Sequence, residues 1–87
     1  MFIEKDVLCW EGAAGNWDSQ DIHYGGCHCW FNIYKSSSLY WGQFYLERFS
    51  LENFETIRKI LPFGHFDTLE EAKQVCLDYY NKVIDVH

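Results

Sequence analysis

Residues 23–29, HYGGCHC, hold two histidines and two cysteines, the side chains that most often bind zinc. On a strand, Cys27 and Cys29 would point to the same side, about 7 Å apart, and Cys76 lies on the helical face expected to pack there. These positions also fit an apolar core, because unpaired cysteine is among the most often buried residue types. We therefore predict buried thiols and no cofactor, with zinc as the alternative. The ligands of that alternative site would be His23, Cys27, Cys29 and Cys76.

The sequence offers little support for catalysis. It contains no Gly-x-Ser-x-Gly, no phosphate-binding glycine loop and no His-Glu-x-x-His. Cysteine and histidine both occur, but nothing in their spacing orients one as a base for the other. We therefore predict that the protein is not an enzyme.

Aromatic residues make up 20% of the chain, which is more than one small core can bury. Residues 27–35 and 39–49 alternate between compact apolar positions and aromatic or polar positions, as strands with one buried face do. The side away from the core carries four large rings, Trp30, Tyr34, Trp41 and Tyr45. Such rings can anchor a protein partner or stack on nucleic-acid bases. They can also form a second small core beneath residues 11–26.

The formal net charge is −6, from seven Lys and Arg against thirteen Asp and Glu. This balance disfavours phosphate backbones and anionic membranes as partners, and it favours a basic protein surface. We expect the acidic contacts to come either from Asp18 and Asp21 or from the C-terminal helix, through Glu70, Glu71, Asp78 and Asp85. We expect the aromatic anchors to be Trp17, Trp30, Trp41 and Tyr45.

The pattern of elements indicates an α+β fold in a single domain over residues 1–87: an antiparallel sheet of three or four strands on one C-terminal helix. Residues 1–10 show a weak strand pattern, residues 11–26 a long loop, and residues 27–49 a hairpin. Residues 50–61 fit a third strand or a short helix. The strand is favoured, and Pro62 is expected to end it.

The C-terminal helix is expected over residues 68–86. Thr68 would be its N-cap, and Glu71 would complete a capping box. The start of the chain lacks the pattern of a signal peptide, and no apolar stretch reaches the roughly 18 residues of a membrane span. We therefore expect a cytoplasmic protein with reduced thiols and no membrane contact.

The stretch GHFDTLEEAK, residues 64–73, is similar to the last strand and helix start of the plant ethylene-response type of DNA-binding domain, and to the arm-binding domains of phage integrases. The resemblance covers residues 63–80 and implies three strands, a Gly-x-Phe-x-Thr turn and a helix on the sheet. In those families the sheet enters the major groove with Arg, Lys and Trp. Here the strands offer only Lys35, Arg48, Arg58 and Lys59 as cations.

In size, acidity and aromatic content the chain resembles the small proteins of phages and mobile elements, anti-CRISPR proteins among them. That resemblance implies a non-enzymatic inhibitor that blocks a nucleic-acid-handling host protein in a bacterial cytoplasm, in some cases by mimicking nucleic acid. Direct binding to nucleic acid is not expected, whereas a homodimer is favoured by an exposed aromatic face. The alternatives are a zinc-stapled interaction domain and a sheet-based DNA- or RNA-binding module. The module would use Trp30, Lys35, Trp41, Arg48 and Arg58.

Overall fold

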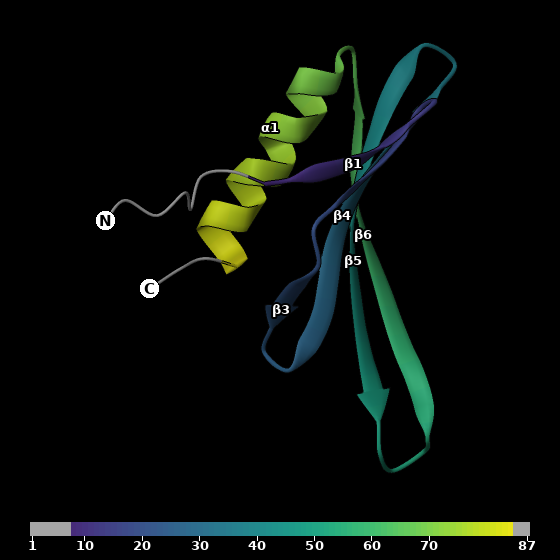
Figure 1. Cartoon of the computed structure of the whole chain (residues 1–87), viewed down its shortest axis with the longest axis vertical. Coiled ribbons are helices and arrows are strands. Elements are labelled where there is room, and N and C mark those ends of the chain that lie inside the picture. Colours follow the sequence, from purple (N-terminus) through teal and green to yellow (C-terminus); the bar gives the residue numbers. More distant parts are fainter. Residues whose placement is uncertain (1–7, 85–87) are drawn as a thin grey trace.

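Six strands and one C-terminal helix form the described part of the computed structural model, residues 8–84 (Figure 1). The strands are β1 (Trp10–Ala13), β2 (Asn16–Ser19), β3 (Ile22–Tyr24), β4 (Cys27–Ser36), β5 (Leu39–Ser50) and β6 (Glu55–Phe66). Helix α1 (Leu69–Tyr79) continues into a π-helical turn, η1 (Tyr80–Ile84). The predicted α+β class, an antiparallel sheet with one C-terminal helix, is confirmed. The strand expected in residues 1–10 lies mostly outside the described residues.

The strands form one antiparallel sheet in the order β1-β2-β4-β5-β6, and β3 pairs with β4 beyond the end of β2. The long loop predicted for residues 11–26 is therefore wrong, because this segment forms most of β1 together with β2 and β3. Three of its four glycines belong to two-residue hairpin turns at Ala14–Gly15 and Gly25–Gly26, where all four residues have positive φ, and Gly12 lies within β1. Most of the glycines that suggested a loop therefore lie in tight turns between short strands.

The hairpin predicted over residues 27–49 is confirmed as β4 and β5, with its turn at Ser37 and Ser38. Both serines have positive φ, 54° and 68°, which a two-residue turn of this kind requires. Asn-Gly is the usual pair at such a turn. Serine, which has a Cβ atom, adopts this left-handed conformation only at a cost in free energy. The extended pairing of the two strands compensates for that cost.

Residues 50–61 contain a turn followed by a strand, as favoured, but Pro62 does not end that strand. β6 continues to Phe66 because it is the edge of the sheet, where a proline needs no ladder partner on its outer side. The register shifts between Gly42 and Gln43, which pair with Gly64 and Pro62, so Phe63 is an extra residue in a bulge. Gly64, expected in a tight turn, has φ of 97° and belongs to this bulge.

Helix α1 begins where the capping pattern predicts. The Thr68 hydroxyl accepts a hydrogen bond from the Glu71 amide at 3.1 Å. Ala72 and Cys76 are fully buried against the sheet, while Val83, seven residues after Cys76 and so on the same side of a regular α-helix, is 38% exposed. The wider π-helical turn after Tyr79 changes the side-chain phase, so that Ile84 packs on the core in its place.

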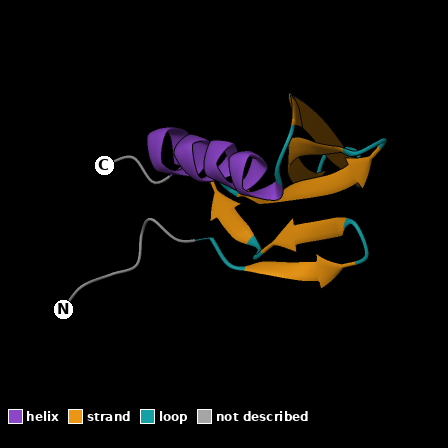
Figure 2. Ribbon diagram, turned by 90° about the horizontal axis from the view of Figure 1, so that it is seen from above, coloured by secondary structure: helices purple, strands orange, loops and turns teal. Residues whose placement is uncertain are grey.

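The core lies between this helix and one face of the sheet. Cys29, Phe31 and Ile33 on β4 have no exposed surface, and the Phe31 ring lies 4.9 Å from that of Phe44. Figure 2 shows the helix along one side of the strands, and no other described element lies on the opposite side. Among residues 8–84, no helix is long and apolar enough to cross a membrane.

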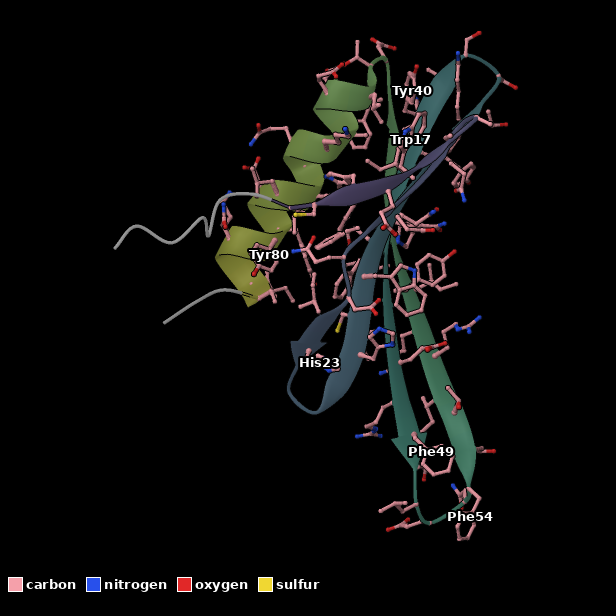
Figure 3. All side chains as sticks on the ribbon, in the orientation of Figure 1. Trp17, His23, Tyr40, Phe49, Phe54 and Tyr80 are labelled. Atoms are coloured by element: carbon pink, nitrogen blue, oxygen red, sulfur yellow. The ribbon has the colours of Figure 1, made fainter. Side chains whose placement is uncertain are left out.

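The end of the β5–β6 hairpin extends well beyond the helix (Figure 1). The last pair between β4 and β5 is His28 with Glu47, so residues 48–57 pair only within their own hairpin. We call residues 48–57 the distal arm. Phe49 and Phe54 lie near its tip (Figure 3) and are 55% and 78% exposed. The arm therefore presents apolar side chains outside the core.

Candidate functional site

The face of the sheet away from the helix is the strongest candidate for a binding site, and we call it the open face. Its centre is formed by four cross-strand pairs between β4 and β5, and these residues alternate along each strand with the residues of the core. These residues are His28, Trp30, Asn32 and Tyr34 on β4, and Trp41, Gln43, Tyr45 and Glu47 on β5. The sequence predicted the four rings Trp30, Tyr34, Trp41 and Tyr45 on this face, and the strand register confirms that prediction.

Aromatic rings form two groups on the open face. In the first, Trp30 stacks on Tyr45 with centroids 5.0 Å apart and planes 2° from parallel, and His28 lies 5.1 Å from Trp30. In the second, Trp41 lies between Tyr34 at 6.4 Å and His65 at 5.0 Å. Stacked rings hold each other in place, so a partner would meet surfaces that lose little conformational freedom on binding.

A hydrogen-bonded network separates the two aromatic groups. Asn32, only 7% exposed, donates to the side chains of Asn16 at 2.9 Å and Asp18 at 2.8 Å. Its side-chain oxygen accepts from Gln43 at 3.0 Å, and Gln43 also donates to the Tyr45 hydroxyl at 2.9 Å. Because these groups satisfy one another, the network fixes the aromatic groups relative to each other and to β2.

An acidic hollow of about 290 Å³ lies beside the first aromatic group. Glu11, Asp18 and Asp21 supply three carboxylates to its lining, next to His28 and Trp30. The Asp21 carboxylate lies 3.0 Å from Nε2 of His28. A ring face beside several carboxylates is a chemical environment that suits an arginine guanidinium or a lysine ammonium.

Arg58, a cation that the strand register places on the open face opposite Glu47, is already paired. Its guanidinium donates two hydrogen bonds to the Glu47 carboxylate on the neighbouring strand. Glu47 in turn lies 4.0 Å from Nδ1 of His28. The charge available to a partner at this end of the open face is therefore negative.

The structure divides the predicted contact residues between two surfaces. Trp30, Trp41 and Tyr45 lie on the open face, Asp18 lies on its β2 side, and Asp21 lines the hollow. Glu70, Glu71 and Asp78 lie on the helix, on the other side of the sheet. Asp85 lies outside the described residues. One flat partner therefore cannot contact both acidic sets.

Trp17, predicted as an anchor, lies on the helix side of the sheet. It is the cross-strand partner of the buried Ile33, and its ring lies 5.9 Å from that of Tyr40 (Figure 3). It packs against the hydrophobic core with part of its surface exposed. The position of Trp17 is explained by its contribution to the stability of the core, and no binding partner is needed to explain it.

The residues proposed for a nucleic-acid-binding sheet do not come together either. Lys35 pairs with Tyr40 and Arg48 with Ile57 in the strand register, so both lie on the helix side. Trp30 and Trp41 lie on the open face, where Arg58 is held by Glu47. If the bases of a nucleic acid stacked on the open rings, its phosphates would meet carboxylates where they need cations.

The proposed zinc ligands are separated by the sheet. His23 pairs with His28 on the open face, whereas Cys29 and Cys76 are buried in the core on the other side. Burial raises the pKa of the Cys76 thiol to about 12, and burial with the neighbouring Cys27 raises the pKa of Cys29. Zinc binds thiolate, which these surroundings disfavour. Within residues 8–84, no group of three or more His, Cys, Asp or Glu side chains converges on a point.

Sequence reasoning missed Glu11, Asn16 and His65 as parts of this surface, and it missed the role of Asn32 as the centre of its network. Glu11 and Asn16 lay in the segment interpreted as a loop, where no alternation could be assigned. The position of Asn32 alternates with the core positions of β4, but nothing in the sequence marks it as the centre of a network. His65 follows Gly64, whose bulge was interpreted as a turn.

No protein-family model matches the chain, and no curated protein or solved structure matches it significantly. The functional assignment therefore depends on the geometry of this surface.

Proposed function

We propose that the protein is a non-enzymatic binding protein whose open face covers a basic surface of a nucleic-acid-handling protein. The observation that carries the proposal is the acidic hollow formed by Glu11, Asp18 and Asp21 beside the Trp30–Tyr45 stack. An arginine or lysine of the partner would enter the hollow, pair with its carboxylates and lie against the Trp30 ring.

Two further features support this mode of binding. Tryptophan and tyrosine are enriched among the residues that contribute most to protein interfaces, and the open face presents Trp30, Trp41 and Tyr45 without a covering element in residues 8–84. The net charge of −6 would also attract a basic partner over long range and speed its association.

The narrower form of the proposal is an inhibitor of the anti-CRISPR type, encoded by a phage or mobile element and acting in the bacterial cytoplasm. Carboxylates on the open face would occupy cationic sites that normally hold phosphates. This form rests on the resemblance in size and composition and on the placement of the acidic hollow.

A binding experiment with two matched variants tests the proposal. The probe is a fluorescently labelled arginine-rich peptide, and the measurement is fluorescence anisotropy at low and moderate salt. The variant Glu11→Gln/Asp21→Asn removes two carboxylates from the hollow while keeping the Asp18–Asn32 hydrogen bond. The control Glu70→Gln/Asp78→Asn removes the same charge from the helix.

We expect the hollow variant to bind the peptide at least about tenfold more weakly, since each charged hydrogen bond contributes roughly 1.5–3 kcal/mol. The helix variant should bind within about twofold of the wild type, apart from a general effect of net charge. Equal losses would mean that the hollow is not the contact site. Salt-sensitive binding of labelled single-stranded DNA in place of the peptide would favour the nucleic-acid-binding alternative.

A further inference from the structure

Strand β6 forms an edge of the sheet, with β5 on one side and no described strand on the other. Edge strands expose unpaired backbone N–H and C=O groups, which can pair with another strand. Pro62 lacks an N–H and the bulge at Phe63 interrupts the ladder, so the regular edge ends at Leu61. Residues 55–61 are thus the part of this edge that is able to accept a new strand.

The charges of residues 55–61 favour pairing with a second copy of the same strand. In a two-fold antiparallel pair, one residue lies opposite its own copy and its neighbours pair in reverse order. When the pair is centred on Ile57, Glu55 of each copy lies opposite Lys59 of the other copy. Two opposite-charge pairs therefore form. Within residues 8–84, Glu55 and Lys59 have no other ion-pair partner.

Other registers are less favourable for stated reasons. Centring the pair on Glu55, Arg58 or Lys59 places that charge directly opposite its own copy. Centring it on Thr56 forms no charge pair, and centring it on Ile60 or Leu61 brings Pro62 into the ladder. The sequence of this edge therefore specifies one register.

Apolar surface is also complementary in this register. The turn of the second copy, with its exposed Leu51 and Phe54, would lie alongside Ile60 and Leu61, which are 50% and 44% exposed. Ile60 and Leu61 line an apolar hollow of about 260 Å³ together with Tyr79. Dimerisation would cover apolar side chains of both copies that are exposed in the single chain.

Lys59, which is exposed, also lines this apolar hollow, and a lysine on an edge strand ordinarily protects that strand from pairing. A neutral partner strand would leave its charge without compensation. Glu55 of a second copy would supply the compensating carboxylate. The same lysine therefore selects this partner over other strands.

We propose that β6 pairs with β6 of a second copy, in an antiparallel two-fold dimer centred on Ile57. The two sheets would become one, and both open faces would lie on the same side of it. The proposal is independent of the function proposed above, because strand pairing uses the edge of the sheet and leaves the open face uncovered.

A charge-exchange experiment tests the proposal by sedimentation equilibrium over a range of protein concentrations. Glu55→Lys or Lys59→Glu alone should raise the dissociation constant about tenfold or more, because two opposite-charge pairs become like-charge pairs. The double variant Glu55→Lys/Lys59→Glu should restore it to within about threefold of the wild type, because the pairs re-form in reverse. The control Glu70→Lys makes the same charge change on the exposed face of the helix, and it should leave the dissociation constant within about threefold of the wild type.

A cross-linking experiment tests the register and does not depend on the stability of the charge variants. In a Cys9→Ser/Cys27→Ser background, Ile57→Cys should give a disulfide-linked dimer on mild oxidation, since residue 57 faces its own copy. Thr56→Cys should not, because it lies opposite Arg58 of the second copy. Three results would each overturn the proposal. The first is a chain that stays monomeric at every concentration, and the second is a dimer whose dissociation constant is unchanged by both single charge variants. The third is equal cross-linking at positions 56 and 57.

Discussion

The two faces of the sheet use the same strands and both carry aromatic side chains, yet the side chains of the two faces are held in place differently. On the covered face, Phe31 and Ile33 have no exposed surface and pack against a helix. On the open face, Trp30 and Trp41 are held by stacking and by a hydrogen-bonded network centred on Asn32. The difference shows that alternation along two strands is enough to separate the residues that stabilise the fold from those available to a partner.

The largest effect is expected on the covered face. Phe31→Ala should lower the free energy of unfolding by about 3–5 kcal/mol, because it removes a fully buried ring and leaves a cavity. For a domain of this size that is a large part of the total stability. Urea denaturation followed by circular dichroism measures it. A loss below about 1 kcal/mol would mean that this face is not the core.

Asn32→Ala tests whether the open face is organised by its network. We expect a loss of about 1–3 kcal/mol, because the substitution leaves hydrogen-bonding groups of Gln43 and Asp18 without their partner. The control Asn16→Ala removes one exposed acceptor that water can replace, so its effect should stay within about 0.5 kcal/mol. Equal effects in denaturation experiments would show that Asn32 is no more important than its neighbours.

The covered face also predicts a response to alkaline pH through Cys76. Its pKa is about 12 in the folded protein, against 9.0 for an unperturbed thiol. Below pH 9 the Cys76 thiol stays protonated in both the folded and the unfolded chain, so its burial contributes fully to the free energy of unfolding. Between about pH 9 and 12 the unfolded chain ionises first, so the free energy of unfolding should fall by about 1.4 kcal/mol per pH unit.

The comparison of wild type with Cys76→Ala isolates this response, because tyrosines and lysines titrate in both proteins. The difference in their free energies of unfolding should be constant from neutral pH to about pH 9 and then narrow as the pH rises. Parallel curves up to about pH 11 would contradict a buried thiol at this position.

The smallest effect on stability is expected for Trp30→Leu on the open face. Loss of the stack with Tyr45 should cost about 1 kcal/mol in the free energy of unfolding. The same change should weaken binding of the arginine-rich peptide severalfold, since the ring lies beside the acidic hollow. A variant as unstable as Phe31→Ala would remove the distinction between the two faces.

The sequence was most informative where one periodicity extended over many residues. The alternation in residues 27–49 predicted both faces of the hairpin, and Thr68 with Glu71 predicted the start of the helix. β1, β2 and β3 have only 4, 4 and 3 residues, which is too short for alternation to be distinguished from chance. Their turns contain the same residue types as a loop.

The site was harder to predict than the fold because it is assembled across strands. The hollow brings Trp30 together with Glu11, Asp18 and Asp21 only after β2 has paired with β4. No local sequence pattern predicts that pairing. The failed expectations for Lys35 and Arg48 have a related cause. Their charge is visible in the sequence, but the side of the sheet on which a charge lies depends on the register.

The connectivity of the sheet has a consequence for how the chain reaches this structure. Every strand pairs with its neighbour in the sequence, except that β2 pairs with β4 across the three-residue β3. Most contacts therefore close short loops, which costs little chain entropy before the contacts form. Among proteins rich in strands, this order favours fast folding, on the order of milliseconds, with β4 and β5 as the hairpin onto which the shorter strands and the helix assemble.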